Sequence, residues 1–170
     1  LYRKNDLSGA INTYRDFINS PASNSLPEKV DAYYNIGYAY LDQGKRDEAI
    51  QSFRTYLQLN PDKANKVVDA TFRVADAYYV NKQNLQAIQY YQQAYNLNSP
   101  LNDKALFYLA KAQGFNGQLP DKALTLTKLL KEAPASKYRM NAQYELARTY
   151  SNSSYKYYPC RLQFHAPKPP

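Results

Sequence analysis

Few side chains in this sequence have the types and spacing that catalysis requires. The chain has one histidine, His165, and one cysteine, Cys160, and no acidic residue lies between residues 153 and 170. A metal site built on these two residues would need further ligands and a better spacing. Motifs typical of zinc peptidases, serine hydrolases and nucleotide-binding loops are absent from the sequence. We therefore expect a protein that is not an enzyme and that uses no cofactor or metal.

The aromatic residues carry the more informative pattern. The chain has 19 tyrosines and no tryptophan. Tyr34, Phe72, Tyr108 and Tyr144 follow one another at spacings of 38, 36 and 36 residues. A tyrosine ring offers a large, rigid contact area, and its hydroxyl can bond to peptide amides and carbonyls. The spacing therefore indicates a row of rings able to bind a peptide, if the chain folds as a regular repeat.

The rest of the sequence repeats with the same period. The three clearest copies are residues 32–61, 70–100 and 104–134. Within the copies, apolar residues recur at the i, i+3, i+4, i+7 spacing of an amphipathic helix. Gly44 is placed to end the first helix of its copy, and the second helix should end before Pro61. Each copy is therefore predicted to form a pair of antiparallel helices.

This pattern resembles the tetratricopeptide repeat (TPR) family. In the clearest copy the matching residues are Tyr33, Ile36, Gly37, Tyr40, Ala49, Phe53 and Pro61, and in the next they are Tyr78, Ala87, Tyr91 and Ala94. The third copy fits at Phe107, Ala110, Ala123 and Leu130 but departs from the pattern at Lys111, Gly114 and Thr127. The resemblance implies an all-α fold, a right-handed α-solenoid of antiparallel helix pairs.

The predicted solenoid covers residues 1–152. It comprises a half unit 1–22, full units 28–62, 65–100 and 101–135, and a half unit 136–152. Residues 153–170 contain four of the ten prolines and are expected to form an irregular or disordered basic tail, or to be a remnant of an expression vector. The two half units favour a fragment of a larger array; a natural short protein with atypical ends is the alternative.

A narrower resemblance concerns the junctions between units. The stretches SPASNSLPEKVDA and EAPASKYRMNAQYELA resemble the longer-period repeats of Gram-negative envelope proteins, the BamD-like lipoproteins and the Tol-Pal-associated YbgF-like proteins. This resemblance implies a bacterial protein of the periplasm or cell envelope. The sequence has no apolar run of the roughly 18 to 20 residues that a membrane span needs.

By resemblance to the TPR family, one stripe of each first helix lines the inner, concave surface of the solenoid. The residues expected there are Tyr34, Tyr38, Leu41, Phe72, Asp76, Tyr79, Tyr108, Phe115, Tyr144 and Arg148. We expect this groove to bind an extended peptide or a partner helix. The alternative is that the rings, Phe72 and Tyr108 above all, pack between neighbouring helices. A chaperone C-terminal carboxylate is not expected, because Tyr, Phe and Asp replace the Lys and Asn that bind it.

The net charge of +8 leaves two further interpretations open. Basic residues together with aromatic rings could bind nucleic acid, and uncapped half units could stack end to end into a structural assembly. However, residues 121–170 hold nine basic and three acidic residues, so the excess lies mostly beyond the aromatic row. We therefore favour a scaffold that binds a protein or peptide, with no small-molecule substrate, over one that binds nucleic acid.

Overall fold

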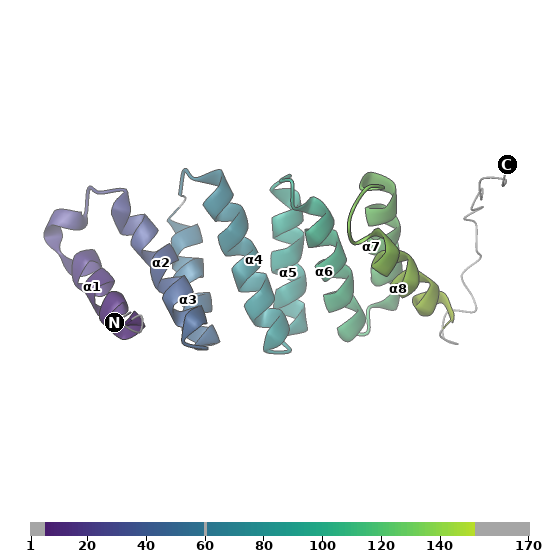
Figure 1. The fold of residues 1–170 in the computed structure, drawn as a ribbon, viewed down its shortest axis with the longest axis horizontal. Helices are drawn as coiled ribbons and strands as arrows, with labels where there is room; N and C mark the ends of the chain where they lie inside the picture. The colour runs from purple at the N-terminus through teal and green to yellow at the C-terminus, as the bar shows by residue number, and fades with distance from the viewer. Residues whose placement is uncertain (1–5, 60, 152–170) are drawn as a thin grey trace, which may run out of the picture.

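The computed structural model describes residues 6–59 and 61–151, and every regular element in these ranges is helical. The predicted tail, with Cys160 and His165, lies outside the described residues. The elements are α1 (Leu7–Asn19), the 3-10 turn η1 (Pro21–Ser23), α2 (Glu28–Asp42), α3 (Arg46–Gln58), α4 (Ala64–Val80), α5 (Asn84–Asn96), α6 (Asn102–Phe115), α7 (Leu119–Glu132) and α8 (Arg139–Ser151). Figure 1 shows them standing side by side in chain order along the molecule.

Each helix packs against the helices that precede and follow it in the sequence. We call α2, α4, α6 and α8 the A helices and α1, α3, α5 and α7 the B helices. The surface that the A helices form together is called the A-helix face. Pairing of α2, α4 and α6 each with the B helix that follows confirms the predicted all-α solenoid of antiparallel hairpins.

Tight turns end the A helices and reverse the chain. Gly44 has φ +74° and donates from its N–H to the Leu41 carbonyl, and Lys45 donates to the Tyr40 carbonyl. This is the Schellman arrangement, in which a left-handed residue after the helix satisfies the last carbonyls. The equivalent turns place Lys82 (φ 60°) and Gly117 (φ 76°) in the same conformation. A lysine thus occupies a left-handed position that usually favours glycine.

The core runs along the array between the A and B helices. Small residues allow close packing: Ala49, Ala87 and Ala123 are all buried on the B helices. Gly37 lies against Phe53, and a Cβ there would lie 2.8 Å from the ring. Because helix-to-helix spacing is fixed in this way, the side chains on the A-helix face hold a regular register from unit to unit.

Two general features bear on function within the described part of the chain. No helix there is long and apolar enough to cross a membrane. Nor do three or more His, Cys, Asp or Glu side chains gather anywhere in residues 6–59 and 61–151 as a metal site requires.

Candidate functional site

The first rings of the expected row, Tyr34 and Tyr38, bind neighbouring helices through both their rings and their hydroxyls. Both rings are half-buried and contact Phe53 of α3, at centroid distances of 5.7 and 5.3 Å. Both hydroxyls donate to the same Asp69 Oδ2 on α4, Tyr34 over 2.8 Å. Arg73 forms an ion pair with Asp69 at 3.2 Å and donates from Nε to the Tyr38 hydroxyl over 2.9 Å.

Burial and hydrogen bonding keep these two tyrosines neutral. Burial raises the pKa of Tyr34 and of Tyr38, and the hydrogen bond to Asp69 raises both further, because a phenolate would face a carboxylate. Arg73 acts in the opposite direction on Tyr38 without reversing the shift. The two hydroxyls are therefore donors committed to α4.

A second group of charges lies beside Tyr34. Lys66 of α4 has its ammonium 5.1 Å from the centre of the Tyr34 ring and 3.1 Å from Asp31. Lys63 also pairs with Asp31. Burial acts to raise the pKa of Asp31, but the hydrogen bonds from Lys63 and Lys66 outweigh it and the pKa is lowered. On the surface between α2 and α4, the tyrosines, carboxylates and cations thus bond mainly to one another.

At the next positions of the row, the side chains are packed in the core or bonded to it. Phe72 is only 2% exposed and is covered by Lys104, whose ammonium lies 4.6 Å from the ring centre. This matches the alternative interpretation, a ring that packs between helices. Asp76 accepts a hydrogen bond of 2.6 Å from Tyr91, a buried residue of α5. Burial and the nearby Asp76 raise the pKa of Tyr91, so it stays a neutral donor.

The remaining expected residues range from half-buried to exposed. Leu41, Tyr79 and Tyr108 are half-buried, and Tyr108 stacks on Tyr91 at 5.8 Å. Phe115, at the end of α6, is 69% exposed although α7 and α8 follow it, and its ring meets Tyr79 at 5.7 Å. Tyr144 is 67% exposed on α8, the last described helix.

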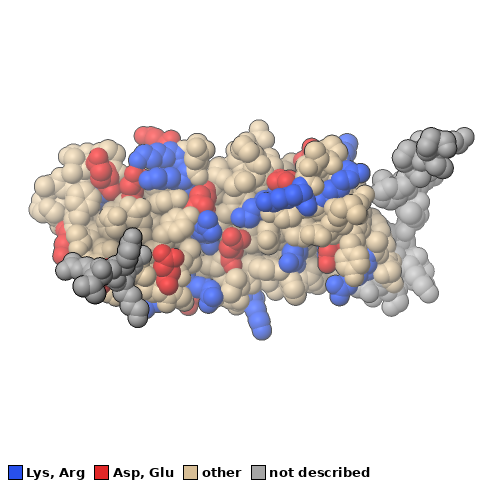
Figure 2. Space-filling model, in the orientation of Figure 1, with Lys and Arg blue, Asp and Glu red and all other residues tan. Residues whose placement is uncertain are grey.

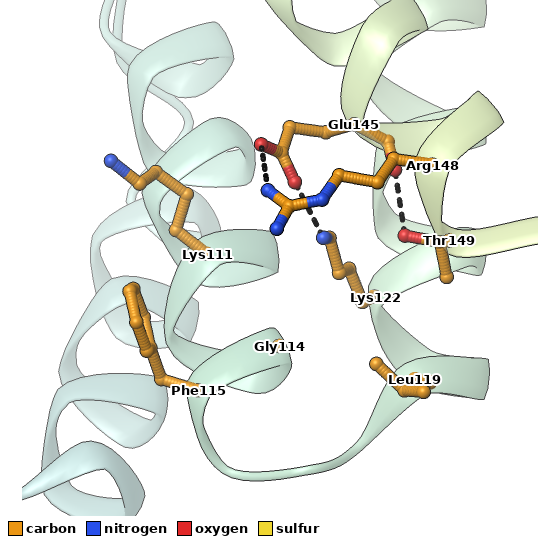
Figure 3. Close-up of a pocket in the computed structure, with 8 residues that line it drawn as sticks. All are labelled: Lys111, Gly114, Phe115, Leu119, Lys122, Glu145, Arg148 and Thr149. Carbon is orange, nitrogen blue, oxygen red and sulfur yellow. Dashed lines mark hydrogen bonds and ion pairs between the residues drawn. The ribbon is translucent and has the colours of Figure 1, made fainter. Parts of the chain in front are cut away.

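A pocket of about 240 Å³ opens beside Phe115 between α6, α7 and α8. Its lining residues are Lys111, Gly114, Phe115, Leu119, Lys122, Glu145, Arg148 and Thr149. Figure 3 shows Lys111 and Phe115 on one side of the pocket, and Glu145, Arg148 and Lys122 grouped together on the other. Lys122, whose side chain is 12% exposed, forms an ion pair of 2.6 Å with Glu145. The structure therefore brings Phe115 and Arg148 of the expected groove to one site.

Sequence reasoning identified Arg148 but missed the other cations of this face and the pocket itself. Lys66 and Lys104, and likewise Arg73 and Lys111, are separated by 38 residues, whereas the aromatic row advances by 36 residues between the same two helices, α4 and α6. Figure 2 shows Lys and Arg side chains spread along the viewed face with acidic residues interspersed among them. The recurrence of two cations from α4 to α6 was still an available signal for the charges of this face, although it is not in register with the rings.

A second signal lay in the departures from the repeat pattern. Two of the three departures in the third copy, Lys111 and Gly114, line the pocket. A Cβ at Gly114 would lie 3.0 Å from the Lys122 side chain, so the glycine leaves room for that lysine. Positions that break a local rule are often functional.

Comparison with protein families gives one match. The tetratricopeptide repeat model matches residues 30–63, which span α2, α3 and the connection that follows. No curated protein matches the sequence. The matched unit is the one in which the sequence pattern is clearest.

Solved structures give a wider match, over most of the chain. The crystal structure of MamA aligns with 21% identity and a TM-score of 0.66, covering 88% of this chain and 80% of that one. YrrB, described as a TPR protein with an unusual peptide-binding site, aligns with 20% identity and a TM-score of 0.67, covering 90% and 72%. A putative kinesin light chain from Podosopora anserina, with nearly identical TPR-like repeats, aligns with 20% identity and a TM-score of 0.64. The alignment covers 85% of this chain and 77% of that one.

At these identities the structures show the fold, which is that of a TPR solenoid. Together with the matched unit, they support the resemblance to the tetratricopeptide repeat family. The three structures do not support the narrower resemblance to BamD-like and YbgF-like envelope proteins.

Proposed function

We propose that this chain is a non-enzymatic scaffold that binds a peptide or an extended segment of a partner protein on its A-helix face, the concave face by analogy with TPR solenoids. Phe115 carries the proposal. It remains largely exposed between helices that are otherwise well packed, it touches Tyr79, and it borders the pocket between α6 and α8. A contiguous surface of apolar and aromatic side chains that borders a pocket favours an interaction site, and the contact of Phe115 with Tyr79 beside the pocket supports this interpretation.

The proposed groove is shorter than the expected row of ten residues. In the α2–α4 part, Tyr34 and Tyr38 have committed their hydroxyls to Asp69, and Phe72 is buried. These residues support the wall of the groove. The ligand is expected to lie over Tyr79, Tyr108, Phe115, Tyr144 and Arg148. The envelope location and the bacterial origin are parts of the same proposal that rest on the sequence resemblance alone.

The test is selection of ligands from a random linear-peptide display library on the purified chain, followed by affinity measurement with the synthesised peptides. Phe115→Ser is expected to weaken binding about tenfold or more, as the loss of a central aromatic contact does. Leu124→Ser is the matched control, because Leu124 is 70% exposed on the B helix α7. It should change affinity by less than about twofold, in the range of neutral contacts.

Two outcomes would contradict the proposal. One is a library that yields no binding peptide. The other is a set of peptides whose affinity is the same for Phe115→Ser as for the wild type, which would place their binding site elsewhere. Circular dichroism of both variants establishes that the helical content is unchanged.

A further inference from the structure

The pocket between α6 and α8 has an excess of positive charge. Lys111, Lys122 and Arg148 line it together with a single carboxylate, Glu145. Glu145 is engaged mainly by Lys122, at 2.6 Å. Its contact with Arg148 is 3.8 Å, which is an ion pair beyond hydrogen-bond length. One carboxylate therefore holds one of the three cations firmly.

The other two cations lack a close carboxylate partner within the described structure, and the Arg148 side chain is 64% exposed to solvent. No described carboxylate other than Glu145 pairs with Arg148, and none pairs with Lys111. Lys111 lies 5.7 to 5.9 Å from the ring centres of Tyr79, Phe107 and Tyr108. These rings hold the ammonium in place without supplying a hydrogen-bond acceptor. An arginine guanidinium in this state is well suited to bind a carboxylate with two parallel hydrogen bonds.

We propose that the peptide bound on the A-helix face places an Asp or Glu side chain in this pocket, between Lys111 and Arg148, and an apolar side chain against Phe115. The inference rests on the proposed function and adds the chemistry of the ligand. The volume of about 240 Å³ is below the range of sites for drug-sized molecules and suits a single side chain. The acidic side chain in the pocket and the apolar side chain against Phe115 would belong to neighbouring residues of one peptide.

A peptide carboxylate fits the site better than a nucleic-acid backbone does. Backbone binding requires a continuous positive path for successive phosphates. Along the A-helix face the carboxylates of Asp31, Asp69, Asp76 and Glu145 interrupt such a path. Lys111 and Arg148 flank a single pocket, which suits one acidic group.

The experiment uses the peptides selected from the random library, synthesised as C-terminal amides so that the only carboxylates are on side chains. Each is also made with its Asp and Glu replaced by Asn and Gln. The combined variant Lys111→Gln, Arg148→Gln should weaken binding of the acidic peptides about tenfold or more, as loss of a bidentate charged contact does. The neutralised peptides should bind weakly and equally to both proteins.

The control variant Arg46→Gln, Lys131→Gln removes the same number of charges from exposed positions of the B helices. It should change affinity by less than about twofold, since surface charges far from a site act only through screened long-range attraction. Glu145→Gln provides the sharper signature. It removes the carboxylate that competes for the cations, so the acidic peptides should bind about threefold more tightly or better. If Glu145 served only to hold α8 in place, binding would weaken.

Failure of this inference can be told apart from failure of the proposed function. Selected peptides that are neutral or basic, that depend on Phe115 and that ignore the Lys111 and Arg148 substitutions would overturn the inference and leave the scaffold intact. A single-stranded oligothymidylate that binds more tightly than the peptides, with the same dependence on Lys111 and Arg148, would also overturn it. Absence of any selected peptide would overturn both.

Discussion

In the α2–α4 part of the A-helix face, the polar side chains form hydrogen bonds and ion pairs with one another. In the α6–α8 part, several polar side chains face solvent, and their hydrogen-bond donors have no close acceptor among the described residues. Tyr34, Tyr38 and Arg73 all converge on Asp69, and Lys63 and Lys66 both pair with Asp31. In the second part, one carboxylate, Glu145, faces three cations of the pocket. Similar residue types thus hold neighbouring helices together in the α2–α4 part, and in the α6–α8 part some of them face solvent.

The difference arises from the residue that lies one helical turn before each cation. Asp69 is one helical turn before Arg73, so the two pair on the same helix and reach the tyrosines of α2 together. The residue four positions before Lys111 is Phe107, a ring that contacts its ammonium but cannot pair with it. A carboxylate one helical turn before the cation thus gives an ion pair within the helix, whereas a ring at that distance leaves the cation without a partner of opposite charge there.

The largest effect on stability is expected at the centre of the cohesive part. Asp69→Asn removes the charged acceptor of two tyrosine hydroxyls and the partner of Arg73. We expect a loss of about 2–3 kcal/mol in the free energy of unfolding, since hydrogen bonds to charged groups contribute most. The measurement is urea unfolding followed by circular dichroism.

Asp121→Asn is the matched control for this substitution. Asp121 is exposed in the first turn of α7, where a carboxylate contributes through the helix dipole alone. Its loss should cost about 0.5 kcal/mol. Equal effects of the two substitutions would show that the network at Asp69 contributes no more than an isolated surface charge.

A smaller, pH-dependent effect is expected at Asp31. Because the pKa of Asp31 is lowered in the folded protein, its stabilising contribution is present above the unfolded pKa of about 3.9 and is lost as the pH falls through the folded value. At pH 7, Asp31→Asn should be less stable than the wild type by about 0.5–1 kcal/mol. The difference should shrink towards zero in acid.

Urea unfolding at a series of pH values measures this convergence. Asp62→Asn, at an exposed position near the same connection, is the control for loss of one negative charge. A difference between Asp31→Asn and the wild type that stays constant from neutral pH to acid would mean that the carboxylate does not titrate against Lys63 and Lys66.

The helical architecture was predictable because its signals are local. Apolar periodicity defines each helix, and Gly44 marks a turn whose left-handed residue the structure confirms. The turn at Lys82 has the same geometry without the glycine, so the hydrogen bonds of the turn and the packing of the two helices impose a conformation that the residue itself does not favour.

Exposure along the aromatic row was less predictable, because it depends on the next helix. The four positions of the aromatic row are equivalent by spacing, yet their surroundings differ. Tyr34 is hydrogen-bonded to Asp69, Phe72 lies in the core and Tyr108 stacks on Tyr91. What covers each ring is a side chain of another helix, such as Lys104 of α6 over Phe72 of α4. Helical spacing identifies the face of a residue, but not what the neighbouring helix places upon it.

The smallest effect on stability is expected at the last ring of the row, Tyr144. It makes no hydrogen bond or ring contact with another described residue and is 67% exposed. Tyr144→Ser should therefore change the free energy of unfolding by less than about 0.5 kcal/mol. It should nevertheless weaken binding of the selected peptides about threefold, as loss of a peripheral ring contact would. A destabilisation well above 1 kcal/mol would show that Tyr144 is covered, as Tyr34 is, and belongs to the cohesive part of the face.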